Sequence, residues 1–334
     1  MSIIEARNLT KTFRTLKRQP GFVGTIRTLF SNEYEEVRAV EDISFAIEPG
    51  ELVGYIGPNG AGKSTTLKML TGILYPSAGT ARVDGLIPYE QRQANGKKIG
   101  VLFGQRSQLL WDIPPRDSFE LMRKMYAVPP ARYAENLTYF TELLELGPLL
   151  DRPVRQLSLG QRMRCELVAS LLHDPKILYL DEPTIGLDVV AKERVREFIC
   201  SVNSQRGTTV VLTTHDIGDI EQLCRRVLII DKGRLLYDGS LTAIKQRYGR
   251  LRRVRFSVAA ATPLDGVLSA LGPDVTLADG EDAGHFAVSF DPHSVPASAV
   301  TKLIVNRLDV TDLAVEEADL EGIIRAIYRR EEGQ

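Results

Sequence analysis

The fold of this chain is decided by residues 55–67, which read Tyr-Ile-Gly-Pro-Asn-Gly-Ala-Gly-Lys-Ser-Thr-Thr-Leu. An apolar run at 52–56 precedes the glycines and Leu-Lys-Met-Leu at 67–70 follows them, which predicts a strand, a glycine-rich loop and a helix. Gly57, Gly60 and Gly62 allow the backbone to curl with its N–H groups directed at an anion, and the helix adds the positive end of its dipole. The stretch matches the phosphate-loop pattern G-x-x-x-x-G-K-S/T in full, so it predicts a nucleoside triphosphate site.

The residues of this loop have separate expected roles. The Lys63 ammonium is placed to reach the β- and γ-phosphates, and the Ser64 hydroxyl to bind Mg²⁺. The other expected contacts to the nucleotide come from Gly57, Pro58, Asn59, Gly60, Ala61, Gly62 and Thr65. A glycine-rich turn that only caps a helix is the alternative, and the complete pattern argues against it.

The composition limits the class of protein. A length of 334 residues suggests two domains, and 43% hydrophobic with 25% charged residues is typical of soluble globular chains. With 42 basic and 43 acidic residues, no global attraction to nucleic acid or lipid follows. The three cysteines show no C-x-x-C spacing, which argues against a disulfide framework or a zinc site and fits the reducing cytosol. The longest apolar runs are far shorter than the ~20 residues of a spanning helix, and residues 1–7 lack the pattern of a signal peptide.

Strands and helices alternate through residues 1–249, where we expect an α/β domain. Expected strands are 2–13, 39–48, 52–56, 79–85, 99–103, 177–180, 208–213 and 227–231; expected helices are 189–204, 216–224 and 241–248. Such alternation implies a parallel sheet covered on both faces. Helical spacing within 115–173 predicts an inserted helical subdomain. Lys232-Gly233 and Asp238-Gly239 indicate tight turns.

Residues 14–38 form an unusually long connection between the first two expected strands. Its apolar residues Phe22, Val23, Ile26, Leu29 and Phe30 fall on one helical face, and Arg14, Lys17, Arg18 and Arg27 give it positive charge. This pattern fits an amphipathic helix at a membrane surface or against a partner. A helix that packs on its own domain fits equally well.

A second, smaller α+β domain is expected at 250–334. The pattern there suggests strands at 250–258, 285–291 and 308–316 and helices at 263–271 and 296–307. Its opening arginines, Arg250, Arg252, Arg253 and Arg255, could bind an acidic partner, although solvated strand edges often carry such charges.

Two acids follow a continuous apolar run at 177–180. This arrangement places Asp181 and Glu182 at the carboxyl end of a buried strand, where α/β sheets bind their ligands. Asp181 is suited to hold Mg²⁺, and Glu182 to act as the base that polarises a water for attack on the γ-phosphate. His215 follows the strand at 208–213 and could reach the γ-phosphate, although a lone histidine is more often structural.

Residues 157–162, Leu-Ser-Leu-Gly-Gln-Arg, complete a set of motifs. With the preceding ones they resemble the nucleotide-binding subunits of ATP-binding-cassette (ABC) transporters, the ABC-2 exporters of the daunorubicin/viologen type in particular. The resemblance covers roughly residues 3–248. It implies a P-loop cassette with a RecA-like parallel core, an antiparallel β subdomain and the helical subdomain, and it implies ATP as the nucleotide. It also implies Gln105 as a catalytic and Mg²⁺-binding glutamine, a D-loop that ends at Asp188, and His215 as the switch histidine.

The same resemblance implies a head-to-tail dimer, homomeric or heteromeric. Ser158, Gly160 and Gln161 of one subunit would close on the γ-phosphate held by residues 57–64 of the other. Leu159 departs from the glycine that is commonest at that position. The adenine-stacking aromatic of the family corresponds to Phe13, with Tyr34 as the alternative. Separate ABC-2 permease chains, a peripheral position on the cytoplasmic face of the membrane and no nucleic-acid partner are also implied, and residues 318–324 resemble the closing segment of similar C-terminal tails.

Three other functions compete with an exporter ATPase. An importer ATPase is the nearest alternative, and residues 14–38 with the short tail favour export. A soluble cassette ATPase of translation or DNA repair would normally show two cassettes or a long coiled coil, whereas this chain has one phosphate loop and no sustained heptads. A nucleotide-gated binding module without turnover would not need Glu182.

Overall fold

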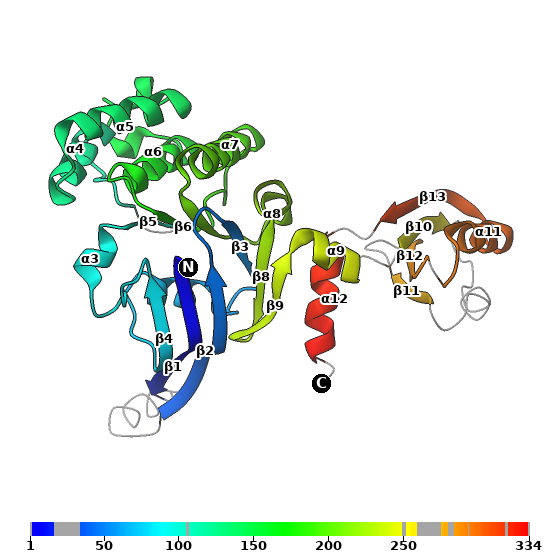
Figure 1. Cartoon of the computed structure of the whole chain (residues 1–334). Coiled ribbons are helices and arrows are strands. Elements are labelled where there is room, and N and C mark those ends of the chain that lie inside the picture. Colours follow the sequence, from blue (N-terminus) through cyan, green and yellow to red (C-terminus); the bar gives the residue numbers. More distant parts are fainter. Residues whose placement is uncertain are drawn as a thin grey trace, which may run out of the picture. The chain divides into compact units, whose positions relative to one another are not determined.

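The structure is a computed structural model that describes residues 2–16, 34–104, 107–248, 252–258, 275–279, 284–292, 294–317 and 320–332. Contacts divide the chain into two units, Met1–Asp238 and Gly239–Gln334. The sheets of the first unit are separate from the sheet β11-β12-β10-β13 of the second (Figure 1). Each unit also has its own hydrophobic core.

The first unit is built on a six-stranded sheet. In spatial order its strands are β5 (Ile99–Phe103), β6 (Ile177–Asp181), β7 (Thr209–Thr213), β3 (Leu52–Ile56), β8 (Arg226–Asp231) and β9 (Arg234–Ser240). From β5 to β8 neighbouring strands run parallel. In β3, Val53 and Tyr55 join the core on one face, whereas a Cβ on Gly54 would lie 2.7 Å from Ile220 Cδ1 of the helix on the other. The alternation shows that both faces are covered, which confirms the expected α/β core.

A three-stranded antiparallel sheet, β2-β1-β4, packs against the parallel one. It consists of β1 (Ile4–Leu16), β2 (Tyr34–Ile47) and β4 (Ala78–Val83). The bounds expected for the connection at 14–38 are wrong, because β1 and β2 extend into both ends of it. Arg14 pairs with Glu36 and Leu16 with Tyr34 in an antiparallel arrangement. The apolar face assigned to Phe22, Val23, Ile26, Leu29 and Phe30 lies outside the described residues.

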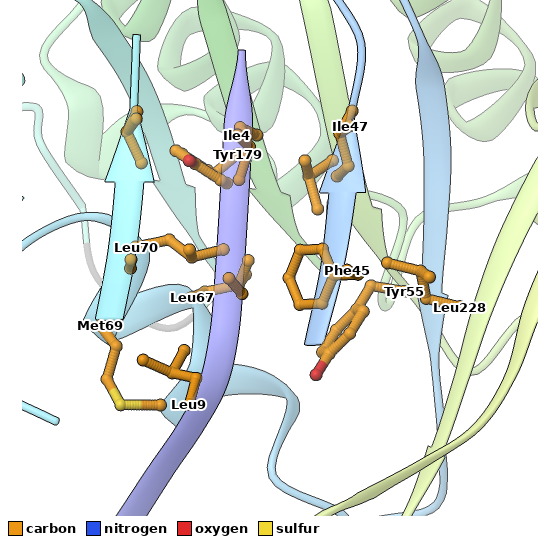
Figure 2. Close-up of a cluster of buried hydrophobic side chains, with 14 of the residues drawn as sticks. Ile4, Leu9, Phe45, Ile47, Tyr55, Leu67, Met69, Leu70, Tyr179 and Leu228 are labelled. Atoms are coloured by element: carbon orange, nitrogen blue, oxygen red, sulfur yellow. The ribbon is translucent and has the colours of Figure 1, made fainter. Parts of the chain in front are cut away.

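The hydrophobic core between these sheets includes residues on both sides of the phosphate loop in the sequence. Side chains of β1, β2, β3, β6 and β8 form one core cluster with those of helix α2 (Lys63–Leu70), and Figure 2 shows part of it. Tyr55 lies before the loop and Leu67 after it, and each is at most 1% exposed. Burial of such side chains contributes about 1.5–3 kcal/mol each, so both ends of the loop are anchored in the hydrophobic core.

Helices carry the rest of the first unit. The expected helical subdomain contains α4 (Pro115–Met125), α5 (Pro130–Leu143) and α6 (Leu159–Leu171), with 3-10 turns at Gly147–Leu149 and Val154–Gln156. The remaining helices are α3 (Arg92–Gly96), α7 (Val189–Arg206) and α8 (Ile217–Leu223). In the part of the chain that is described, no helix is both long and apolar enough to cross a membrane.

Strand β9 corrects the interpretation of Asp238-Gly239 as a turn. The other expected turn, at Lys232-Gly233, is confirmed, because both residues have positive φ. Asp238 then lies within β9 and accepts a two-pronged ion pair from Arg226 of β8, at 2.8 and 2.9 Å. Pairing with the neighbouring strand therefore overrides the local turn preference.

The second unit contains an antiparallel sheet in the order β11-β12-β10-β13. Its elements are α9 (Leu241–Tyr248), β10 (Arg252–Val258), β11 (Val275–Asp279), β12 (His285–Phe290), α11 (Ala297–Arg307), β13 (Val310–Glu317) and α12 (Leu320–Glu332). The expectation missed β11 and α12, and the helix expected at 263–271 lies outside the described residues. Counted by contacts, this unit includes α9, which packs against α12.

Candidate nucleotide-binding site

The phosphate loop spans the gap between the end of β3 at Ile56 and the start of α2 at Lys63. Gly60 and Gly62 have left-handed backbones, with φ of 84° and 107°. A Cβ on Gly62 would lie 2.4 Å from the carbonyl oxygen of Ala39, and a Cβ on Gly57 would lie 2.4 Å from that of Ile230. Because β2 and β8 press on the loop from outside, glycine is required for both the turn and the space.

Lys63 is buried within the loop, at 7% exposure. Its Nζ donates to the carbonyl oxygens of Gly57 at 2.6 Å and Pro58 at 3.0 Å. Burial lowers the pKa of Lys63, and the carboxylates of Glu182 and Asp181 act in the opposite direction. The ammonium is thus held inside the curl of the loop, where a phosphate oxygen can replace the carbonyl partners.

Ser64 and Asp181 meet at the same edge of the parallel sheet. The Ser64 hydroxyl donates to Asp181 Oδ2 at 3.1 Å, and the Thr213 hydroxyl donates to Asp181 Oδ1. Hydroxyl and carboxylate oxygens suit Mg²⁺, which usually takes one or two protein carboxylates, phosphate oxygens and waters. The donor set therefore fits Mg²⁺ beside a nucleotide. Gln105 lies outside the described residues.

Thr213 was missed by the sequence reasoning. It is the last residue of β7, and the register of β6 and β7 pairs it with Asp181. Its position at a strand end was visible in the sequence, but the neighbour of that strand was not.

Glu182 follows Asp181 and is the next residue at this edge. Its φ of 55° is left-handed, a conformation that costs a non-glycine residue about 1–3 kcal/mol. Its N–H donates to the carbonyl oxygen of Thr213 at 2.9 Å. The carboxylate Oε1 lies 3.2 Å from His215 Nδ1, with the two side chains 23% and 59% exposed. The turn therefore directs a partly exposed carboxylate toward the ring of His215.

Ser158, Gly160 and Gln161 lie at the start of helix α6, where Ser158 is the N-cap. Ser158 Oγ accepts from the Gln161 N–H at 3.3 Å, and Gln161 Oε1 accepts from the Ser158 N–H at 3.0 Å, which forms a capping box. Gly160 faces α7, since a Cβ there would lie 3.3 Å from Ala191 Cβ. Ser158 is exposed, and so is Leu159, at 43%.

Asp188 and the two aromatic candidates have the following positions. Asp188 caps α7 by accepting from the Ala191 N–H at 2.8 Å. Phe13 pairs with Val37 in the β1–β2 hairpin, and Lys11 Nζ lies 5.3 Å from its ring centroid. Tyr34 lies at the far end of the same hairpin, opposite Leu16.

Glu166 of α6 is a further residue that the sequence reasoning did not single out. Its buried carboxylate accepts from the Ser107 hydroxyl and, at 3.0 Å, from the Gln108 N–H. It ties the segment that follows Gln105 in the chain to the helix that begins at Ser158.

Comparisons with known proteins agree on one family. The family model described as ABC transporter matches residues 40–185. The Nod factor export ATP-binding protein I of Paraburkholderia xenovorans is 37% identical over 212 residues, which cover 63% of this chain and 69% of that protein. The daunorubicin/doxorubicin resistance ATP-binding protein DrrA of Streptomyces peucetius is 30% identical over 297 residues, which cover 88% of this chain and 89% of DrrA.

A solved structure has a similar fold. It is a dimeric post-hydrolysis state of the ATP-binding cassette MJ0796 bound to ADP and Pi, with a TM-score of 0.59 and 25% identity. The match covers 71% of this chain and 98% of that one.

Proposed function

This chain belongs to the ATP-binding proteins of ABC transporters, and from that premise we propose that it is the ATP-hydrolysing subunit of an ABC-2 type exporter. Export is supported by the relative from Paraburkholderia xenovorans, whose name includes it. The match to DrrA spans 88% of this chain, so it includes part of the second unit as well as the cassette.

The proposal depends chiefly on the bond between Ser64 and Asp181. This bond brings a phosphate-loop hydroxyl and a strand-end carboxylate together at the mouth of a loop that contains a buried lysine. The N–H groups of residues 57–64 and the Lys63 ammonium would hold the phosphates of ATP. Ser64, Asp181 and, from the resemblance, Gln105 would hold Mg²⁺, which when bound supplies positive charge to the phosphate oxygens.

Glu182 is proposed as the general base. Its carboxylate would accept a proton from the water that attacks the γ-phosphate. His215, with Nδ1 3.2 Å from Glu182 Oε1, would hold that carboxylate in place and sense the γ-phosphate. The cost of the left-handed turn at Glu182 is consistent with a residue held for function rather than for stability.

A second copy is proposed to complete the site. Capping uses Ser158 Oγ as an acceptor, so its O–H can still donate to a phosphate. The start of α6 adds N–H groups and a positive dipole end, and Gly160 presents no side chain. We propose that Ser158, Gly160 and Gln161 contact the γ-phosphate of the opposing copy, with Asp188 at the same interface.

Phe13 is proposed as the adenine-stacking residue. The carbonyl of Ala39 lies against Gly62 of the loop, and Phe13 pairs with Val37, two residues away. Tyr34 is five residues from Ala39, or ~17 Å along an extended strand. The register therefore favours Phe13.

The membrane path is proposed to come from separate ABC-2 permease chains, with this chain peripheral on the cytoplasmic face. The helical subdomain, tied through Glu166 to the segment after Gln105, would pass the motion of ATP binding to the permease. Residues 1–249 are proposed as the cassette and 250–334 as an accessory domain.

The proposal is tested with the purified full chain. Glu182→Gln should abolish steady-state release of phosphate from MgATP and yield an ATP-dependent dimer in size-exclusion chromatography. The matched control is Glu197→Gln, at an exposed position of α7, which should behave as wild type. Full activity of Glu182→Gln would refute the base, and wild-type chain that neither binds nor hydrolyses ATP would refute the function.

A further inference from the structure

A buried carboxylate lies behind the candidate catalytic pair. Asp219 of α8 is 0% exposed. Its Oδ2 accepts from the Thr184 hydroxyl and, at 3.3 Å, from the Thr214 hydroxyl. Its Oδ1 accepts from Arg196 Nε at 2.7 Å and lies 2.6 Å from Arg196 Nη2. Both oxygens are therefore used.

The two threonines belong to the segments that carry Glu182 and His215. Thr184 comes two residues after Glu182, at the exit of β6, and Thr214 comes directly before His215, at the exit of β7. These strands are parallel neighbours, and at their ends the Glu182 N–H donates to the carbonyl oxygen of Thr213. Asp219 adds a second connection between the same segments, made through side chains.

Helix α7 supplies the positive charge that stabilises this buried carboxylate. A buried ion is stable only when it is paired and hydrogen-bonded. Arg196, at 14% side-chain exposure, provides both. One turn earlier, Lys192 pairs with Asp216 at 2.6 Å, and Asp216 caps α8 through the Gly218 N–H. Two cations of α7 therefore hold two acids at the start of α8, and α8 is fixed relative to both loop segments.

We propose that Asp219 is a positioning residue for ATP hydrolysis, which holds the segments of Glu182 and His215 in the register that gives their 3.2 Å contact. The inference rests on the proposed role of Glu182 as the base. Asp219 acts through the Thr184 and Thr214 hydroxyls and does not itself touch the nucleotide. Because the Asp219 carboxylate bonds to Thr184, Thr214 and Arg196 and to no residue of the phosphate loop, loss of this connection should slow the chemical step and leave ATP binding intact.

The main test compares Asp219→Asn with wild type in the full chain. The amide cannot accept from Arg196 and both hydroxyls as the carboxylate does. Misplacement of catalytic groups by about 1 Å can cost 10²-fold in rate, so kcat should fall about 10- to 100-fold. The dissociation constant for ATP should stay within about two-fold of wild type.

The matched control removes a different acid from the same arginine. Glu193 lies 3.4 Å from Arg196 on the outer side of α7, with its side chain 55% exposed, so Glu193→Gln removes a neighbouring charge and leaves the loop segments alone. Its kcat should equal that of wild type.

Two further variants keep the inference testable if Asp219→Asn does not fold. Thr184→Val and Thr214→Val each remove one hydroxyl that donates to Asp219 and leave the ion pair with Arg196 in place. Thr214→Val also removes the acceptor of the Asp216 N–H, so Thr184→Val is the cleaner of the two variants. Each should lower kcat with ATP affinity unchanged. A purely structural role would instead lower the melting temperature and leave the kcat of folded chain at the wild-type value.

The outcomes separate this inference from the proposed function. Wild-type kcat in the folded threonine variants would overturn the role of Asp219. If Glu182→Gln is inactive at the same time, the proposed role of Glu182 as the base still stands. An active Glu182→Gln would overturn the base itself.

Discussion

The Ser64 hydroxyl and the Asp181 carboxylate, 117 residues apart in the chain, lie 3.1 Å apart at one edge of the parallel sheet. One belongs to the first turn of α2 and the other ends β6. The contact depends on the strand order β6-β7-β3, which places the end of β6 two strands away from the loop that follows β3. Thr213, on the intervening strand, bonds to the other carboxylate oxygen.

This contact leads to a prediction for Mg²⁺. Asp181→Asn keeps an oxygen that accepts from Ser64 but loses the negative charge, so the Mg²⁺ concentration for half-maximal ATP hydrolysis should rise about 10- to 100-fold. Phosphate release measured against Mg²⁺ at fixed ATP checks this. Asp112→Asn, whose side chain is 76% exposed, is the control. An unchanged Mg²⁺ dependence would remove Asp181 from the metal site.

Lys63 should determine ATP affinity. Lys63→Ala removes a charged donor worth about 1.5–3 kcal/mol, so the dissociation constant for ATP should rise about 10- to 100-fold. Titration with a fluorescent ATP analogue measures it. Lys68→Ala, in the last turn of the same helix, should bind as wild type. Equal affinity of Lys63→Ala and wild type would contradict the phosphate-loop role.

Gly62 should be essential for the loop backbone. An alanine there would combine φ of 107° with a Cβ placed 2.4 Å from the carbonyl oxygen of Ala39. Gly62→Ala should therefore lower the free energy of unfolding by about 1–3 kcal/mol or more and weaken ATP binding. Urea denaturation measures the first effect. The control is Gly96→Ala, where a Cβ meets nothing within 4 Å; equal stability of the two variants would be evidence against this geometry.

Glu166 should make stability depend on pH. Burial raises the pKa of Glu166 above its ordinary value of 4.5, although bonds from Ser107 and Gln108 act in the other direction. The folded chain thus holds this proton more tightly than the unfolded chain. The resulting stability is full below pH 4.5 and is lost as the pH rises through the raised pKa.

The side chain of Glu166→Gln does not titrate, so this variant does not lose stability as the pH rises. Its free energy of unfolding, relative to wild type, should increase from pH 4.5 to about pH 8. Chemical denaturation over that range measures the difference, with the exposed Glu142→Gln as control. Parallel curves for Glu166→Gln and wild type would contradict the shift.

Some expectations failed because tertiary pairing overrode a local signal. Asp238-Gly239 is a common turn dipeptide, yet Asp238 lies in β9 because Arg226 on the adjacent strand binds its carboxylate. Likewise, the helical spacing within 14–38 did not reveal that residues 14–16 and 34–38 extend a hairpin. Short segments with mixed preferences adopt the conformation that their neighbours can pair with.

The sequence by itself determined the phosphate loop, the order of strands and helices in the first unit, and the two acids after residues 177–180. Each of these depends on backbone preferences and hydrophobic periods that act over a few neighbouring residues. Only the tertiary structure decided that Ser64 meets Asp181, that Thr213 bonds to the same carboxylate, and that Asp219 joins the segments of Glu182 and His215. These contacts depend on which strands lie side by side, and strand order is set by burial and pairing across the whole core, which no short stretch encodes.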